Sequence, residues 1–189
     1  MQNFIRLPHP QVVRQRVRAL ALLDALLISD VPVRRFNYRS GWDDEEDLAF
    51  MYTPEHAKWC VLFAGDRVVI KGSDPQHNIS ELDIPPFDDP QVREFWHTDP
   101  CDTLCSSFGF EYRDQQWQAL IPPVAGSLKL LDAWFVEPLV YARQLGERTG
   151  QMVDAEAIAH LFAGKTISPS WLKQYFPQSD WQHQAADWL

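Results

Sequence analysis

The chain has 189 residues, of which 46% are hydrophobic and 23% charged, and its formal net charge is −9. A chain of this length buries about 70% of its unfolded surface on folding, so that it needs neither a metal nor a disulfide for stability. The negative charge argues against a general nucleic-acid binder and against binding to anionic membranes, since both require a basic surface. It suits a protein whose partner has a basic surface.

The cysteines and the N-terminal sequence indicate a reducing compartment. Cys60, Cys101 and Cys105 are odd in number and lack the spacing of a disulfide framework. The first residues lack the basic-then-apolar order of a signal peptide. The longest apolar stretch, ALALLDALLI, contains Asp24 and is far shorter than the about 20 residues that cross a bilayer. We therefore expect a cytoplasmic protein with reduced thiols.

The first 122 residues are predicted to form a helix followed by an antiparallel sheet. Apolar side chains recur at helical spacing over residues 11–28. From residue 33 the apolar period changes to two, and apolar runs of strand length follow at 47–53, 59–65 and 67–72. Because the connections are short, these strands should form an antiparallel meander, with one face covered by the first helix. A second hairpin is expected over 106–121, with residues 113–115 at its tip.

The rest of the chain is predicted to be mostly helical. Residues 73–91 contain four prolines and should form a loop, after which Pro90 begins a short helix capped by Asp88 or Asp89. Residues 128–150 predict one helix, or two divided at Pro138, with Gly150 at the end. Further helices should begin after Asp154 and at Ser168-Pro169, and a last short one within 180–189.

These elements predict an α+β fold. Its antiparallel sheet should have about four to six strands, backed by the N-terminal helix and followed by a helical C-terminal part. We assign residues 1–189 to a single domain, with a sheet portion at 1–122 and a helical portion at 123–189.

An unbroken acidic run provides the candidate binding residues. It follows Trp42 directly, and a run of like charge is usually a solvated loop. An aromatic side chain with acidic neighbours would also anchor a partner with a basic surface and steer it during association. The candidate residues are therefore Trp42, Asp43, Asp44, Glu45, Glu46 and Asp47.

A second candidate site lies after the strand at 67–72. Asp74 and His77 could act as an acid–base pair, with Lys71 nearby in sequence. The same segment is a typical turn, in which Asp74 accepts from the backbone and the following proline fixes its own dihedral, and we favour the turn. The alternative is an enzyme, a hydrolase or transferase centred on Asp74, His77 and His97.

The sequence gives little support for a metal site or for nucleotide binding. His97, Cys101 and Cys105 stand four residues apart, the spacing that places ligands on one face of a helix. Pro100 interrupts that helix and the chain has no Cys-x₂-Cys pair, so that we expect neither a metal site nor a cofactor. The sequence contains no phosphate-binding glycine motif and no hydrolase motif.

Residues 154–176 have the outline of a helix-turn-helix, with Gly164 in the turn. The second helix, PSWLKQYF, offers only Ser170, Lys173 and Gln174 to base edges, and its aromatic residues favour a packed helical hairpin. A nucleic-acid regulator therefore ranks third.

The stretches VVIKGSDPQHNIS, IPPFDDPQVREFW and SSFGFEYRDQQW together resemble a bacterial family of small, uncharacterised cytosolic proteins. In that family a strand and a Lys-Gly-x-Asp loop precede a proline-containing segment, a short helix and a strand pair ending in tryptophan. The resemblance covers about residues 68–117. It departs after Lys71-Gly72, where Ser73, Pro75 and Gln76 replace the aromatic and His-Glu residues of the family. It supports the fold and implies no chemistry.

These observations favour a non-catalytic bacterial protein-binding module, of which a toxin-immunity or antitoxin protein would be an instance. Such proteins are often small, acidic and without catalytic motifs, because they need only cover the active cleft of a toxin. We expect another protein as the partner, and neither a membrane, nucleic acid nor a cofactor. The sequence leaves the oligomeric state open.

Overall fold

The computed structural model describes residues 7–43, 45–77, 79–80, 87–97 and 105–184. The chain divides into two compact units, Met1–Arg14 with Arg39–Leu130, and Gln15–Tyr38 with Leu131–Leu189. This division differs from the predicted portions, because residues 15–38 group with the C-terminal helices and the later boundary falls after Leu130.

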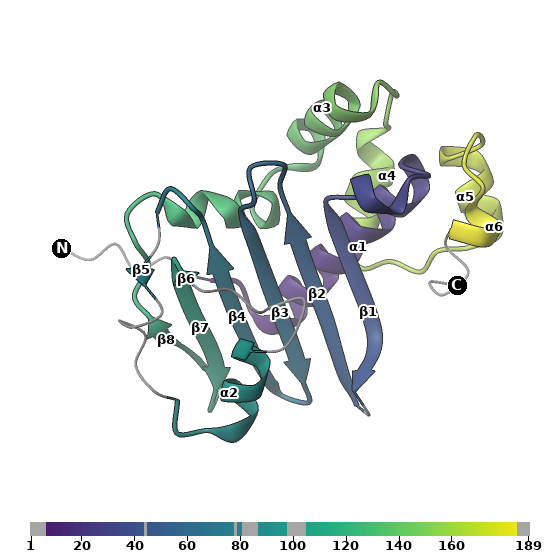
Figure 1. Ribbon diagram of the computed structural model, residues 1–189. Helices are drawn as coiled ribbons and strands as arrows, with labels where there is room; N and C mark the ends of the chain where they lie inside the picture. The colour runs from purple at the N-terminus through teal and green to yellow at the C-terminus, as the bar shows by residue number, and fades with distance from the viewer. Residues whose placement is uncertain (1–6, 44, 78, 81–86, 98–104, 185–189) are drawn as a thin grey trace. The chain divides into compact units, whose positions relative to one another are not determined.

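The first unit is built on a six-stranded sheet with the order β1-β2-β3-β4-β7-β8 (Figure 1). The pairs from β2 to β8 are antiparallel, which confirms the predicted meander and the second hairpin. A separate antiparallel pair joins β5 to β6. The strands are β1 (Phe36–Asp43), β2 (Glu46–Tyr52), β3 (Lys58–Ala64), β4 (Arg67–Ser73), β5 (Ile79–Ser80), β6 (Cys105–Ser106), β7 (Phe108–Arg113) and β8 (Gln116–Ile121).

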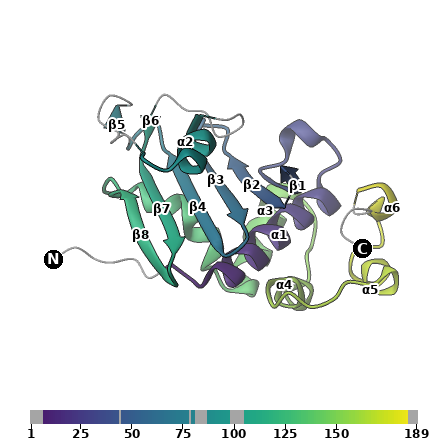
Figure 2. The same ribbon diagram turned by 90° about the horizontal axis from the view of Figure 1, so that it is seen from below.

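The central strands are buried on both faces, which explains their continuous apolar runs. On one face, Leu62 and neighbouring strand residues pack against Val92, Phe95 and Trp96 of α2 (Pro90–His97), which lies over this face in Figure 2. Residues of alternate parity point to the other face. There Phe63 lies 4.8 Å from the guanidinium carbon of Arg14, in the first turn of α1 (Pro10–Leu27).

Helix α2 is fixed at both ends. Asp89, one of the two residues predicted as the cap, accepts hydrogen bonds from the backbone of Gln91 (2.9 Å) and Val92 (3.2 Å). At the other end the buried Lys71 donates to the carbonyl of Trp96 over 2.7 Å, where the helix dipole favours a cation. Lys71, a possible catalytic residue by its sequence position, therefore has a structural role.

The second unit is mainly helical, as predicted for the end of the chain. Of the two alternatives predicted for residues 128–150, the structure shows the division at Pro138, and Gly150 ends α3 (Pro138–Thr149) with a φ of 70°. Asp154 and Ser168 accept hydrogen bonds from the backbone at the starts of α4 and α5. The elements after β8 are η3 (Ser127–Trp134), which begins in the first unit, α3 (Pro138–Thr149), α4 (Ala155–Phe162), α5 (Pro169–Tyr175) and α6 (Trp181–Gln184).

Asp24 is the polar centre of the second unit. Its side chain is fully buried in α1 and accepts hydrogen bonds from the backbone of Arg35 (2.7 Å) and Phe36 (2.9 Å). The guanidinium of Arg148, on α3, forms an ion pair with the same carboxylate. One carboxylate thus joins the first helix, the start of β1 and α3.

Within the part of the chain that the structure describes, no helix combines the length and the hydropathy needed to cross a membrane.

A glycine at the tip of the β7–β8 hairpin should stabilise the protein. Asp114 and Gln115 have φ values of 50° and 61°, the left-handed conformation of a two-residue hairpin turn, which costs a side chain about 1 kcal/mol. We expect Gln115→Gly to raise the free energy of unfolding by about 1 kcal/mol in urea titrations. Gln118→Gly, an exposed position within β8, should lower it, and equal losses for both variants would contradict the assignment of the turn.

Removal of the Asp24 carboxylate should destabilise the protein strongly. Asp24→Ala leaves Arg148 without its partner and two backbone N–H groups without an acceptor, at an expected cost of about 3–5 kcal/mol in the free energy of unfolding. Glu147→Gln, on the exposed part of α3, is the control and should change it by less than about 0.5 kcal/mol. A similar small effect for both variants would contradict the role given to Asp24.

Candidate functional site

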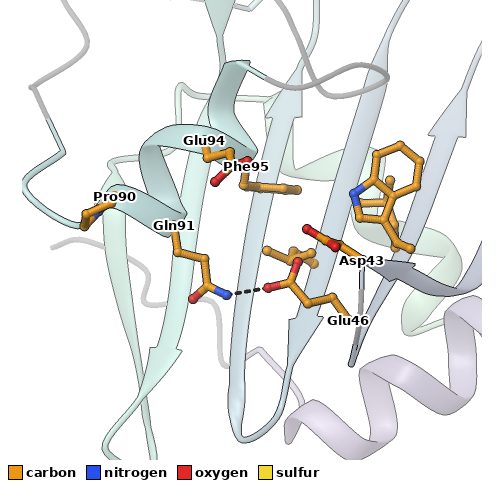
Figure 3. Close-up of a pocket in the computed structure, with 9 residues that line it drawn as sticks. Asp43, Glu46, Pro90, Gln91, Glu94 and Phe95 are labelled. Atoms are coloured by element: carbon orange, nitrogen blue, oxygen red, sulfur yellow. Dashed lines mark hydrogen bonds between the residues drawn. The ribbon is translucent and has the colours of Figure 1, made fainter.

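The candidate site is a pocket of about 560 Å³ in the first unit, between α2 and the ends of β1 and β2 (Figure 3). Its floor is apolar, since Leu48, Leu62 and Phe95 are buried members of the core beneath it. The lining residues are Trp42, Asp43, Glu46, Leu48, Leu62, Pro90, Gln91, Glu94 and Phe95.

The pocket is acidic. Three of its lining residues are carboxylates and none is a cation. Figure 3 shows Asp43 and Glu46 on the strand side of the pocket and Glu94 on the helix above it. A hollow of about 740 Å³ beside the first turn of α1 differs, because Arg14 lines it together with Asp66 and Asp114. The low-dielectric floor of the pocket strengthens the negative potential of its rim.

The structure corrects the expectation that the whole acidic run is a loop. Strand β1 continues to Asp43 and β2 begins at Glu46, so that the run forms the end of a hairpin. Successive strand residues point to opposite faces, which separates Glu46, in the pocket, from Asp47. Asp47 accepts hydrogen bonds from Ser40 Oγ (3.2 Å) and Gly41 N (3.1 Å). Its role is therefore structural.

The other candidate binding residues also differ in whether they line the pocket. Trp42 is half-buried and packs on the core cluster at the pocket wall. Glu45 is exposed and lines an adjoining hollow of about 800 Å³ together with Asp43 and Glu46. Asp44 lies outside the described residues. Three of the six predicted residues, Trp42, Asp43 and Glu46, thus line the pocket.

A hydrogen-bond network around Arg67 sets the helix wall of the pocket. The guanidinium donates to Glu111 Oε1 (2.6 Å), forms an ion pair with Asp89 Oδ2 (2.9 Å) and donates to Gln91 Oε1 (2.8 Å). Gln91 in turn donates to Glu46 Oε1, so that the network reaches the pocket (Figure 3). The arrangement orients one of the three pocket carboxylates.

The charges of this network reinforce each other. Burial alone would lower the pKa of Arg67, but the hydrogen bonds and charges of Asp89 and Glu111 outweigh it and raise the pKa. The hydrogen bond from Arg67 is the largest cause that lowers the pKa of Asp89. Both charged forms are therefore stabilised in the folded protein.

Sequence patterns missed the helix side of the pocket. Gln91, Glu94 and Phe95 lie on a helix that was predicted, and the helical period assigns Phe95 to the core. The helical period cannot tell which strands the helix covers. The one sign of this side of the pocket in the sequence is that an acidic residue, Glu94, precedes an aromatic one, Phe95.

Asp74 and His77 lie together, as the acid–base hypothesis requires, and Asp74 accepts from the backbone, as the turn hypothesis requires. The Asp74 carboxylate accepts from Gln76 N (3.0 Å), lies 3.0 Å from His77 Nδ1 and 3.5 Å from Lys129 Nζ. Burial alone would raise the pKa of Asp74, but these hydrogen bonds and the Lys129 charge lower it. His97 is the exposed last residue of α2, and no contact among the described residues links it to the pair.

The remaining candidates for metal or nucleic-acid binding have other surroundings. In the described ranges, no group of three or more His, Cys, Asp or Glu could hold a metal ion. Cys60 is buried in β3, Cys105 Sγ lies 3.4 Å from Ser73 Oγ, and Cys101 is outside the described residues. In the second unit Trp171 of α5 stacks on His160 of α4, with 4.7 Å between ring centres, as expected for a packed helical hairpin.

No family model, curated protein or solved structure matches the chain significantly. The resemblance of residues 68–117 to small bacterial proteins stays a prediction. Function must therefore be argued from the pocket itself.

The charge of Asp89 should support the fold in a pH-dependent way. Asp89→Asn keeps the cap of α2, because asparagine caps as well as aspartate, but removes the ion pair with Arg67. We expect a loss of about 1 kcal/mol in the free energy of unfolding at pH 7, since the pair is partly exposed. The folded-state pKa of Asp89 is lowered, so that this contribution is complete above the unfolded pKa of about 3.9 and disappears as the pH falls through the folded value.

Urea titrations of both proteins between pH 7 and pH 2.5 measure this difference. The two stabilities should converge only below about pH 4. A constant difference over the whole range would show that the charge of Asp89 does not matter.

Proposed function

We propose that the chain is a non-catalytic protein-binding module that engages a partner with a basic surface. The pocket and the adjoining acidic hairpin, with Trp42, Asp43, Glu45 and Glu46, form the binding surface. The observation that carries this proposal is a concave, apolar-floored pocket whose lining contains three carboxylates and no cation. Apolar anchoring provides affinity at such a surface, and the charges provide rapid and selective association.

A bacterial toxin-immunity or antitoxin protein of the cytoplasm fits this surface best. Such a protein acts by covering a basic cleft, which requires shape and charge and no chemistry of its own. The net charge of −9 supports the proposal, because it would attract a basic partner from a distance.

The test is capture of the partner from the native lysate by the tagged full-length chain, at low and at moderate salt, with identification by mass spectrometry. We expect one stoichiometric protein that is held more weakly as salt rises. The double variant Asp43→Lys/Glu45→Lys reverses two exposed charges and should slow association by about tenfold or more, with little change in melting temperature.

The matched control is Asp132→Lys/Glu147→Lys, which makes the same charge change at exposed positions of the second unit. It should slow association much less. Equal effects of the two double variants would show that net charge alone drives binding and that the pocket is not the interface.

A second candidate is a hydrolase or transferase, which the 3.0 Å contact between Asp74 and His77 favours. The carboxylate would orient the imidazole, and the other ring nitrogen, Nε2, would act as the base. A side chain at position 126 would crowd that nitrogen, since a Cβ there would lie 3.0 Å from it, and Gly126 leaves this space open. His77→Gln should leave partner capture unchanged if the binding proposal is correct, and loss of capture would place the interface at this pair instead.

A further inference from the structure

We propose that the pocket binds the side chain of an arginine in the partner protein. This inference rests on the proposed function and specifies the group that the pocket recognises. The volume of about 560 Å³ falls in the range of about 300–1,000 Å³ that is typical of ligand sites. It therefore has room for an arginine side chain together with the backbone on either side.

The three pocket carboxylates come from three separate elements. Asp43 ends β1, Glu46 begins β2 and Glu94 lies in α2. Among the described residues, no group of three or more His, Cys, Asp or Glu could hold a metal ion. Carboxylates supplied by separate elements around an apolar floor suit an extended organic cation. The planar guanidinium has five N–H donors and can engage more than one carboxylate, whereas a lysine ammonium is a point charge.

The apolar part of the pocket suits the rest of an arginine side chain. Leu48 and Leu62 form a floor on which a methylene stem could pack while the charged end stays at the rim. Trp42 and Phe95 add aromatic rings, and a guanidinium over such a ring is stabilised by its negative face.

An arginine of the chain itself already contacts one of these two rings, that of Trp42. The guanidinium carbon of Arg39 lies 5.3 Å from the ring centre of Trp42 and 5.7 Å from that of Phe50. Arg39 is exposed and is not among the residues that line the pocket. Its positive charge beside the rim should weaken the attraction for an incoming arginine. Removing that charge should therefore increase the affinity of the pocket for arginine, whereas a general disturbance of the surface would lower it.

The experiment titrates the full-length protein with the peptide acetyl-Gly-Gly-Arg-Gly-Gly-amide and follows backbone NMR shifts. The comparison peptide carries citrulline, which has the same shape as arginine but no charge. We expect the arginine peptide to bind at least about tenfold more tightly than the citrulline peptide, and more tightly than its lysine analogue. The shifts should centre on β1, β2 and α2.

Isosteric variants assign the effect to single residues. Asp43→Asn and Glu94→Gln should each weaken binding of the arginine peptide several-fold, and Arg39→Gln should strengthen it. Asp132→Asn and Glu147→Gln, exposed in the second unit, are the matched controls and should leave the affinity unchanged. The melting temperature of each variant verifies that it is folded.

Several results would overturn the inference. Equal binding of the arginine and citrulline peptides would do so, and so would an unchanged affinity in both pocket variants. Equally tight binding of spermidine would show that the pocket takes small cations and not an arginine of a protein. If the peptide fails but lysate capture still depends on Asp43 and Glu45, the arginine assignment is wrong and the proposed function stands; if both fail, the proposed function is wrong too.

Discussion

The guanidinium of Arg67 joins parts of the first unit that lie far apart in the sequence. It contacts β7 through Glu111, the cap of α2 through Asp89, and the pocket wall through Gln91. Removing one partner from such a partly buried network leaves the others with uncompensated charge, which makes the arrangement cooperative. Arg67 thus holds the N-terminal end of α2, and with it the helix side of the pocket, while Lys71 and the apolar packing of Phe95 and Trp96 hold the rest of the helix on the sheet.

The acidic residues of this unit therefore have two different roles. Asp89 and Glu111 are neutralised by Arg67, and Asp47 bonds to the backbone of β1 and lies 3.8 Å from Arg14. Asp43 and Glu46 line the pocket together with Glu94. Cations lie beside Asp47, Asp89 and Glu111, whereas the residues that line the pocket include three carboxylates and no cation. This difference in composition, more than the net charge, supports the proposed cationic partner.

Features that neighbouring residues determine could be predicted from the sequence, whereas contacts between distant residues could not. The runs of β3 and β4 and the helix starts at Asp154 and Ser168 are set by neighbours in the sequence and were predicted. For the cap of α2 and the division at Pro138 the sequence left two alternatives each, one of which the structure shows. The pairing of Asp24 with Arg148 spans 124 residues, and no local pattern could indicate it.

In the acidic run, too, the local sequence pattern does not determine the structure. Its charge predicts a solvated loop, but hairpin pairing brings Asp43 and Glu46 into strands and directs Glu46 and Asp47 to opposite faces. Trp42, Asp43 and Glu46 could be proposed as binding residues because they belong to one short segment of the sequence. Glu94 and Phe95 could not, because only the docking of α2 brings them to the same pocket.

A partner that binds at the pocket between α2 and the β1–β2 hairpin should protect both from solvent. Hydrogen–deuterium exchange of the chain, alone and in complex with the captured partner, measures this protection. We expect it to concentrate in β1, the start of β2 and α2, and to decrease as salt is raised. Protection confined to the Asp74–His77 turn or to α4 and α5, with the hairpin and α2 unchanged, would contradict binding at the pocket.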